Sequence, residues 1–459
     1  MAPKFGTSGL RGLVVDLTPE LVAQYTHAFL AACETGSAVR VGWDLRPSSP
    51  AISKAVIEAI TAAGGRAIVD GALPTPALAL ASLNEGQSAI MVTGSHIPAD
   101  RNGLKFYTPC GEISKGDEAA ILAQLGVKLE GQGVQIDATG DAIAAYVARY
   151  VNGFGADALS GLRIGVYQHS SVAREIMVDV VKALGGDAVP LAWSDTFIPV
   201  DTEAVDPATR AQLAQWCDEH ELDALISTDG DADRPMVTDA RGKIVAGDVL
   251  GPLTARLLGA ERICTPVSSN TMVDAMPEFS DVVRTRIGSP FVIAAMEAGG
   301  AQNVVGYEAN GGFLLGYLAD GPAGQLPPLM TRDCLLPILA PLYLGRKAGC
   351  GLAELVAGLP ARFTATDRLT GIATDISGPF LEGLSIDAEA RGVFFDEMPV
   401  EQSVDLTDGL RVTFEGGDIV HLRPSGNAPE FRCYVEADNK QRADTLLATF
   451  LGEIRALLS

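Results

Sequence analysis

The sequence predicts an α/β protein in which three similar mixed α/β domains with mainly parallel sheets precede a smaller C-terminal α+β domain. Short apolar runs alternate with helix-period segments that end in paired glycines, over residues 40–65, 163–186 and 262–300. This alternation is typical of βαβ units, whose strands are parallel and buried. After about residue 365 the pattern changes to shorter alternating strands, and a helix over residues 440–458 closes the chain.

Length and charge limit what the protein can be. A chain of 459 residues is too long for one hydrophobic core and suggests three or four domains. The net charge of −23 argues against nucleic acid and against membrane surfaces as partners, because both require a basic face. An anionic substrate would therefore need cations gathered locally in its site.

The cysteines and the N-terminus indicate a cytoplasmic protein. The seven cysteines are scattered, odd in number and never form a Cys-x-x-Cys pair, which fits reduced thiols better than disulfides or a zinc site. The first residues contain no apolar signal segment. The most apolar long stretch, residues 335–344, contains two prolines and is too short to span a bilayer.

Each of the three similar domains has a second apolar strand that runs into a polar loop containing glycine. These loops begin at Thr93, Asp229 and Gly306. Ligand sites in open α/β sheets lie outside the carboxyl ends of the strands. We therefore expect the three loops to form one composite site, although any one of them alone could be an ordinary turn.

The first loop places Ser95 beside Gly94, an arrangement that allows a serine to act as a nucleophile. The alternative is a serine that caps the next segment. A Ser-His-Asp hydrolase is disfavoured, because adjacent residues such as Ser95 and His96 rarely face one another and the chain has no Gly-x-Ser-x-Gly elbow. Ser95 must then be activated in another way.

The second loop carries Asp229, Asp231 and Asp233 at alternate positions, where they can converge on one hard cation. The EF-hand alternative is rejected, because its glycine and its terminal glutamate are missing here. Three carboxylates this close repel each other strongly without a cation. Magnesium usually takes few protein ligands plus phosphate oxygens, so a phosphate on Ser95 would complete the site.

Other polar residues could complete the chemistry. Glu308 and Asn310 in the third loop could grip neighbouring hydroxyls of a sugar. Lys105 could be a general base or a surface lysine, and His96 a proton carrier or a structural residue. Arg11 lies in a glycine-punctuated segment and could contact a phosphate or the nucleophile.

A fourth loop follows an apolar strand near the C-terminus. It combines a guanidinium, a hydroxyl and an amide with backbone N–H groups that can form an anion nest. The alternative is a surface hairpin turn. The residues are Arg423, Pro424, Ser425, Gly426 and Asn427.

In sequence order, these motifs resemble those of the α-D-phosphohexomutase family (phosphomannomutase/phosphoglucomutase-like) along essentially the whole chain. The matching motifs are Phe-Gly-Thr-Ser-Gly-x-Arg-Gly, the serine loop with a downstream Asn-Gly-x-Lys, Asp-Gly-Asp-x-Asp-Arg, the glutamate loop and the Arg-Pro-Ser-Gly loop. The chain departs from the family at four positions. Gly94 and Ile97 stand where the family has Ala and Asn, Gly312 where many members have His, and Asn427 where it has Thr.

The resemblance implies four domains around a central cleft and a role for each. A catalytic phosphoserine domain is expected at 1–153, a metal-binding domain at 154–250, a sugar-binding domain at 251–365 and a phosphate-binding α+β domain at 366–459. Ser95 would be phosphorylated and, with the three aspartates, would hold one Mg²⁺ per chain. Further implied roles are proton transfer by His96 and Lys105, contact with the phosphoserine by Arg11 and Arg234, sugar binding by Glu308 and Asn310, and distal-phosphate binding by Arg423, Ser425, Gly426 and Asn427.

The activity implied is interconversion of hexose 1-phosphate and hexose 6-phosphate, with mannose, glucose or both as the sugar and hexose 1,6-bisphosphate as intermediate and activator. The enzyme would act as a monomer or homodimer. Phosphoglucosamine mutase is the alternative within the class. A phosphatase and a non-catalytic sugar-phosphate-binding protein are the alternatives from other classes.

Overall fold

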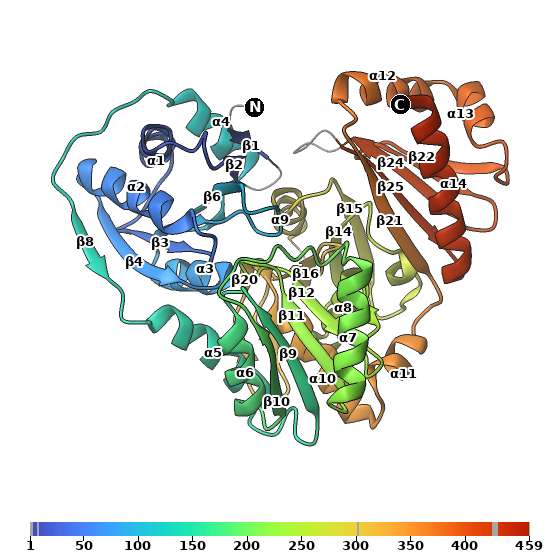
Figure 1. Ribbon diagram of the computed structural model, residues 1–459, viewed down its shortest axis with the longest axis horizontal. Coiled ribbons are helices and arrows are strands. Elements are labelled where there is room, and N and C mark those ends of the chain that lie inside the picture. Colours follow the sequence, from blue (N-terminus) through green and yellow to red (C-terminus); the bar gives the residue numbers. More distant parts are fainter. Residues whose placement is uncertain (1–2, 7–8, 301–302, 425–429, 459) are drawn as a thin grey trace.

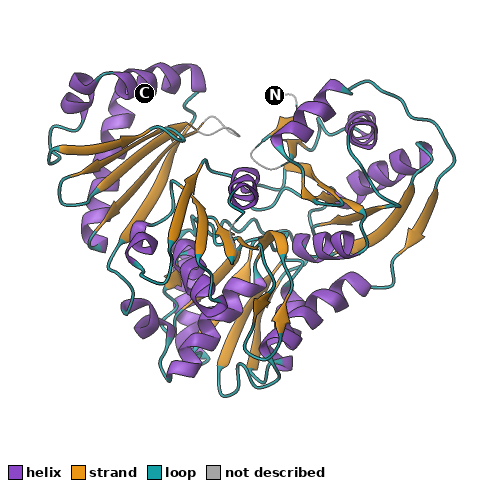
Figure 2. Cartoon of the chain, turned by 180° about the vertical axis from the view of Figure 1, so that it is seen from behind, coloured by secondary structure: helices purple, strands orange, loops and turns teal. Residues whose placement is uncertain are grey.

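The computed structural model describes residues 3–6, 9–300, 303–424 and 430–458, which form four units, each built on its own sheet (Figure 1). The first unit and the fourth lie on opposite sides, and the second and third lie between and below them. Helices cover the sheets of all four units (Figure 2). The predicted fold class is confirmed.

The first unit has an eight-stranded sheet in the order β1-β2-β6-β5-β3-β4-β8, with β7 paired to β6. Strands β3, β4, β5 and β8 are parallel, and β6 returns antiparallel to β5 directly after the serine loop. The elements are β1 Lys4–Phe5, β2 Leu10–Leu13, α1 Pro19–Ala32, β3 Val39–Trp43, α2 Ser49–Ala62, β4 Arg66–Ala72, α3 Thr75–Asn84, β5 Ser88–Val92, β6 Arg101–Thr108, β7 Gly111–Glu112, α4 Lys115–Ala123, β8 Val134–Asp137 and α5 Asp141–Phe154.

The second and third units repeat this plan in five-stranded sheets, ordered β10-β9-β11-β12-β13 and β15-β14-β16-β17-β20. In each, three parallel strands are followed by antiparallel ones, and the site loop lies at the change of direction. The elements are β9 Arg163–His169, α6 Arg174–Ala183, β10 Asp187–Trp193, α7 Pro207–Glu219, β11 Ala224–Thr228, β12 Pro235–Thr238, β13 Ile244–Val245, α8 Gly247–Leu258, β14 Arg262–Pro266, the 3₁₀ helix η1 Thr271–Ala275, β15 Asp281–Thr285, α9 Ser289–Ala298, β16 Val304–Tyr307, β17 Phe313–Leu315, β18 Ala319–Asp320, β19 Gln325–Leu326, β20 Leu329–Asp333, α10 Leu335–Ala348 and α11 Leu352–Ala357.

The fourth unit is the predicted α+β domain, with an antiparallel sheet in the order β21-β25-β24-β23-β22. One face of this sheet is apolar and packs on the helices, and buried residues alternate with less buried ones along β23 and the first part of β25. The elements are β21 Phe363–Thr370, α12 Thr374–Ile386, α13 Ala388–Phe394, β22 Glu401–Asp405, β23 Leu410–Phe414, β24 Ile419–Pro424, β25 Glu430–Ala437 and α14 Lys440–Leu458.

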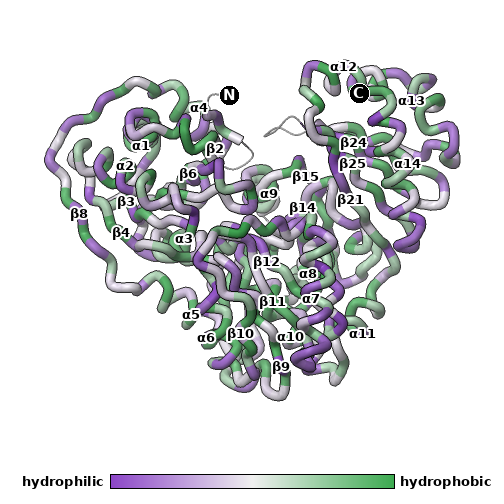
Figure 3. Tube along the Cα trace, viewed as in Figure 1, coloured by the Kyte–Doolittle hydropathy of each residue, from purple (hydrophilic) through white to green (hydrophobic). Residues whose placement is uncertain are grey.

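The hydrophobic cores show how the units are joined. One cluster of buried residues runs continuously through parts of the first three units, whereas the fourth unit has a core of its own. Apolar residues concentrate along buried elements such as β11 and α10 (Figure 3). In the described part of the chain, no helix is long and apolar enough to cross a membrane. The hydrophobic core of the fourth unit is therefore separate from the core shared by the first three.

A cavity of about 310 Å³ lies where the second, third and fourth units meet. None of the predicted site residues that the structure describes lines it. Its wall includes Asp248 of α8, which is 3% exposed and accepts a hydrogen bond from Asn270 N at 2.9 Å. Burial raises the pKa of Asp248 from 3.8 to about 7 against the effect of the Asn270 N–H, and the carboxylates of Glu436 and Glu203 add to the rise.

We expect Asp248 to make the protein less stable as the pH rises. A carboxyl group whose folded-state pKa is raised holds its proton longer in the folded chain, so stability is lost between its ordinary pKa and about 7. Between pH 5.5 and 8, the unfolding free energy of Asp248→Asn should therefore fall by roughly 2 kcal/mol less than that of the parent protein. Urea denaturation at the two pH values measures the difference. The exposed Asp320→Asn is the control, and an unchanged pH dependence in Asp248→Asn would contradict the expectation.

Candidate active site

The serine loop of the first unit and the Asp loop of the second are in direct contact. Ser95 Oγ donates a hydrogen bond to Asp229 Oδ2 at 2.6 Å. The two loops also pack closely through their backbones, since a Cβ on Gly230 would lie 3.0 Å from the Ser95 carbonyl oxygen. The structure thus brings together the two loops that the sequence analysis joined through a phosphate on Ser95.

Ser95 has a left-handed backbone, with φ of 55°, which is uncommon for a residue other than glycine. Its N–H donates to Thr93 Oγ1 at 2.7 Å, and its side chain is 3% exposed. The expectation that Ser95 and His96 do not face each other is wrong, because Ser95 Oγ lies 3.3 Å from His96 Nδ1. Burial, followed by the nearby Arg234 guanidinium, holds the pKa of His96 well below its usual range, so the imidazole is neutral.

Arg46 holds the serine loop in place, and sequence reasoning missed it. This arginine is 1% exposed and donates to the carbonyl oxygens of Ser95 and Ile97 at 2.8 and 2.6 Å. It also donates to the Pro98 and Arg101 carbonyls, and its Nε is held by Asp44 at 3.0 Å. The available signal was its position just after β3, at the carboxyl edge of the sheet where the serine loop also lies.

Gly94→Ala is expected to lower the unfolding free energy by about 1–3 kcal/mol. A Cβ at this position would lie 2.5 Å from Arg46 Cζ, so either the guanidinium or the loop must move. Chemical denaturation measures the loss, with Gly116→Ala as control, because a Cβ there meets only Ser114 Oγ at 3.4 Å. Equal stability of Gly94→Ala and the parent protein would contradict close packing at this point.

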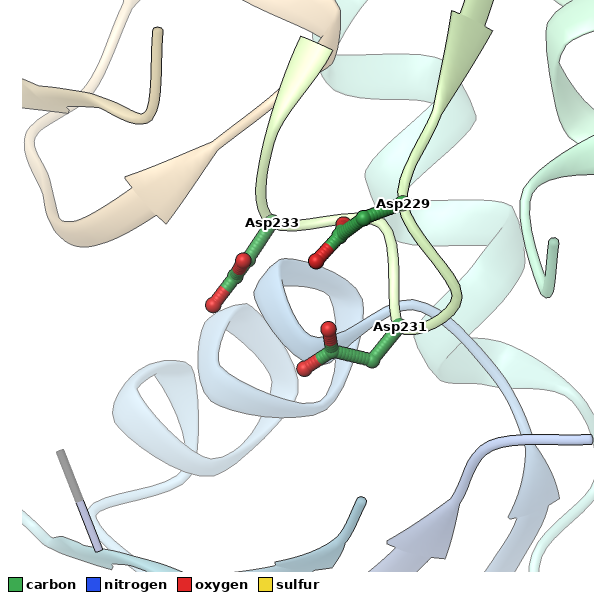
Figure 4. Close-up of side chains that lie close together, drawn as sticks. All are labelled: Asp229, Asp231 and Asp233. Atoms are coloured by element: carbon green, nitrogen blue, oxygen red, sulfur yellow. The ribbon is translucent and has the colours of Figure 1, made fainter. Parts of the chain in front are cut away.

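Asp229, Asp231 and Asp233 form a buried carboxylate cluster. Their ligand oxygens lie within 4.8 Å of one another, and Figure 4 shows the three carboxylates projecting from one loop toward a common space. Burial, and then the neighbouring Asp231 and Asp233 charges, raises the pKa of Asp229 well above its usual value. Among the described residues, no group donates a hydrogen bond to Asp231 Oδ1 or Asp233 Oδ1. Buried carboxylate oxygens without donors are what a hard cation such as magnesium requires.

Two cations compensate part of this negative charge. The Lys105 ammonium donates to Asp231 Oδ2 at 2.6 Å and to Asp233 Oδ2 at 2.5 Å. Although burial alone would raise the pKa of Asp231, Lys105 and the Thr75 hydroxyl hold it below its usual value. Arg332, which the sequence analysis did not single out, lies 2.8 Å from Asp233 Oδ2 through Nη2. Lys105 is therefore a buried member of the cluster and not a surface residue.

Two of the three predicted arginines, Arg11 and Arg234, also lie beside these loops. Arg11 donates through Nη1 to the carbonyl oxygen of Thr93, and burial lowers the pKa of Arg11 to about 10. Arg234 Nε lies 3.7 Å from Asp233 Oδ1, and its backbone N–H donates to Asp229 Oδ1 at 3.3 Å.

The third loop, for which we expect sugar binding (the sugar loop), reaches the carboxylate cluster through Arg332. Glu308 is 4% exposed, and its Oε2 lies 3.3 Å from Arg332 Nη1. Asn310 Oδ1 accepts the Gly312 N–H at 3.0 Å, and this contact holds the loop in shape. The third loop is thus part of the same site, as expected from the three equivalent strand ends.

The fourth loop stands apart from the other three. Arg423 Nε donates to Asp408 Oδ1 at 2.8 Å, and in the described ranges no hydrogen bond or ion pair joins it to the serine or Asp loops. Ser425, Gly426 and Asn427 lie outside the described residues. The strand register places Arg432 beside Arg423, and Arg368 beside Arg432. Neither arginine was singled out from the sequence, although residue alternation along β25 and β21 could have indicated that they share a face with Arg423.

Comparison with known proteins agrees with this arrangement. Residues 2–129, 144–242 and 245–363 match α/β/α domains I, II and III of the phosphoglucomutase/phosphomannomutase family, and residues 386–452 match its C-terminal domain. A phosphomannomutase from Sinorhizobium fredii is 44% identical over 99% of both chains. A probable phosphoglucosamine mutase from Methanopyrus kandleri is 29% identical over 99% of this chain and 98% of the relative.

A solved structure shows the same fold. It is a phosphoglucomutase/phosphomannomutase family protein from Burkholderia thailandensis, with a TM-score of 0.77 and 22% sequence identity, and the match covers 98% of this chain and 96% of that one. All four domain types are matched in order, and together the matches extend over most of the sequence. The chain therefore belongs to the phosphoglucomutase/phosphomannomutase family.

Proposed function

We propose that the protein is a magnesium-dependent phosphohexomutase that interconverts the 1-phosphate and 6-phosphate of mannose, glucose or both. The phosphoryl group is carried by Ser95, and a hexose 1,6-bisphosphate is the intermediate and the activator. The observation that supports the proposal is the 2.6 Å contact between Ser95 Oγ and Asp229, because a hydroxyl group beside a buried carboxylate cluster could accept a phosphoryl group next to a bound cation. The protein is proposed to act in the cytoplasm, as a monomer or homodimer.

The residues of the site fit phosphoryl transfer, in which catalysis is mostly positioning and stabilisation of negative charge. Asp229, Asp231 and Asp233 would hold one Mg²⁺, which supplies an electrophilic contact to the phosphoryl group when bound. The Arg11 and Arg234 guanidinium groups favour the negative charge of a phosphoserine.

Proton transfer is assigned to two neighbours of the nucleophile. His96, whose Nδ1 lies 3.3 Å from Ser95 Oγ, is the first candidate for exchanging a proton with the serine oxygen. Lys105, buried between Asp231 and Asp233, is the second candidate for exchanging a proton with the sugar hydroxyl. The site therefore provides two separate groups, one for the serine oxygen and one for the sugar oxygen.

Arg423 is proposed to bind the phosphate that is not being transferred, with Ser425, Gly426 and Asn427 of its loop. Such a contact is similar in the ground state and the transition state, so its loss mainly raises KM. Arg423→Ala should raise KM about 10- to 100-fold in both reaction directions. Arg442→Ala, which breaks an Arg–Asp pair in the same unit, is the control. An Arg423→Ala enzyme that keeps its KM but no longer phosphorylates Ser95 would place Arg423 at the transfer point instead.

The choice of sugar follows from the relatives. The 44% identical relative is a phosphomannomutase, and the probable phosphoglucosamine mutase is 29% identical, so mannose and glucose phosphates rank before glucosamine phosphate. The four predicted domains, 1–153, 154–250, 251–365 and 366–459, are retained as part of the proposal, with one site loop in each.

The test is a substrate panel with a trace of hexose 1,6-bisphosphate, followed by ³¹P NMR. Mannose 1-phosphate or glucose 1-phosphate should become the 6-phosphate with no net release of inorganic phosphate. Release of phosphate to water would indicate a phosphatase. Binding of the sugar phosphate without turnover would indicate a non-catalytic binding protein, and turnover of glucosamine phosphate alone would favour the phosphoglucosamine alternative.

A further inference from the structure

Arg332 links the sugar loop to the Asp loop with a single side chain. One terminal nitrogen, Nη2, lies 2.8 Å from Asp233 Oδ2, and the other, Nη1, lies 3.3 Å from Glu308 Oε2. The arginine is 4% exposed, and both carboxylates are also buried. A planar guanidinium can hold two carboxylates at a fixed separation, which a lysine ammonium at the end of a flexible stem cannot do.

The surroundings fix Arg332 in this position. The side-chain stem of Arg332 occupies the space beside Gly312. A Cβ at position 312 would lie 2.8 Å from Arg332 Cγ, so this position of the arginine depends on a glycine in the sugar loop. Asp333, the next residue, accepts hydrogen bonds from the hydroxyls of Tyr146 and Tyr150 of α5. The end of β20 is thus anchored on the side away from the site.

The contact also orients Glu308. With Oε2 held by Arg332, the other oxygen, Oε1, accepts no hydrogen bond from any residue that the structure describes. A carboxylate with one oxygen fixed by an arginine and one open can accept a sugar hydroxyl in only a narrow range of directions.

We propose that Arg332 is a positioning residue that sets Glu308 for the sugar and ties its position to the metal-binding loop through Asp233. This inference rests on the proposed function, because it assigns Glu308 to the sugar and Asp233 to magnesium. It predicts that sugar recognition and magnesium binding respond to Arg332 in opposite directions. Arg332 helps to orient the Glu308 carboxylate for the sugar, but its positive charge competes with magnesium for Asp233.

Two variants of Arg332 distinguish the effect of its charge from the effect of its contact with both carboxylates. Arg332→Gln removes the charge, so magnesium alone should bind about 3- to 10-fold more tightly while KM for the hexose phosphate rises about 10-fold or more. Arg332→Lys keeps the charge but cannot span both carboxylates, so magnesium binding should stay within about twofold while KM rises about 10-fold. A purely structural defect would weaken both kinds of binding together.

The measurements are magnesium titration by calorimetry and steady-state kinetics, on protein whose Ser95 phosphorylation state is matched by mass spectrometry. Arg391→Lys is the matched control, because Arg391 is 9% exposed and forms a two-point pair with Glu401 in the fourth unit. In the double variant Glu308→Gln/Arg332→Lys, KM should rise no further than in the more affected single variant, because both changes break the same contact between Arg332 and Glu308.

The inference is overturned if Arg332→Gln binds magnesium no more tightly than the parent, if both variants keep the parent KM, or if the two substitutions act additively. Failure of the proposed function looks different. In that case the parent protein itself would not convert hexose phosphates. The calorimetric comparison would still show whether Arg332 competes with magnesium for Asp233.

Discussion

Ser95→Ala is expected to reduce mutase turnover by at least about 10⁴-fold, as loss of a covalent nucleophile does elsewhere. The alanine removes the only oxygen of this side chain, the one that lies 2.6 Å from Asp229 and 3.3 Å from His96. The same substitution should remove the phosphate that intact-protein mass spectrometry is expected to detect on the parent enzyme. Coupled assay of hexose 6-phosphate formation measures the turnover.

A buried serine elsewhere in the first unit provides the control. Ser82 of α3 is fully buried and donates only to the Ala79 carbonyl in its own helix, so Ser82→Ala should keep the phosphate and most of the activity. A Ser95→Ala enzyme with full activity would remove the central assignment of the site.

Asp229→Asn is expected to lower turnover by roughly 10²- to 10³-fold, the loss associated with removal of one electrostatic stabiliser. The amide is nearly isosteric and can still accept the Ser95 hydroxyl, but it is a poor ligand for a hard cation. The parent enzyme should lose activity in EDTA and regain it with magnesium, and the variant should need much more magnesium. Activity that is indifferent to chelation would contradict the metal site.

The same substitution should stabilise the metal-free protein. Burial, and then the charges of Asp231 and Asp233, raise the pKa of Asp229, so ionising this carboxyl group in the metal-free protein costs stability. Replacing the carboxylate should raise the unfolding free energy in EDTA by about 1 kcal/mol or more. A variant that is both less active and less stable in EDTA would show that Asp229 is a structural residue.

The strand-end loops could be found from sequence because their positions follow from local rules. Apolar runs predict the buried strands, glycines mark where the runs stop, and the carboxyl edge of a sheet collects the loops. The segments predicted to end in paired glycines near residues 65, 186 and 300 contain helices that end at Ala62, Ala183 and Ala298, each just before a glycine-bearing turn. The roles assigned to the individual site residues stay predictions until they are tested.

Arg46 and Arg332 could not be placed in the same way, because their partners are distant in the chain. The serine-loop carbonyls that Arg46 binds lie 49 to 55 residues away, and a buried arginine looks like a surface one in a single sequence. The wrong expectation for Ser95 and His96 has a local cause. Neighbouring side chains diverge in extended backbone, whereas the left-handed turn at Ser95 brings these two together.

The φ of 55° at Ser95 also limits which hydroxyl-bearing amino acid can occupy this position as the nucleophile. Threonine carries the same hydroxyl group, but its β-branched side chain crowds the backbone at positive φ, where branched residues are true outliers. Glycine would suit the backbone but has no oxygen. The turn therefore excludes the chemically equivalent residue by shape alone, and serine is the one standard amino acid that combines an unbranched Cβ with a primary alcohol.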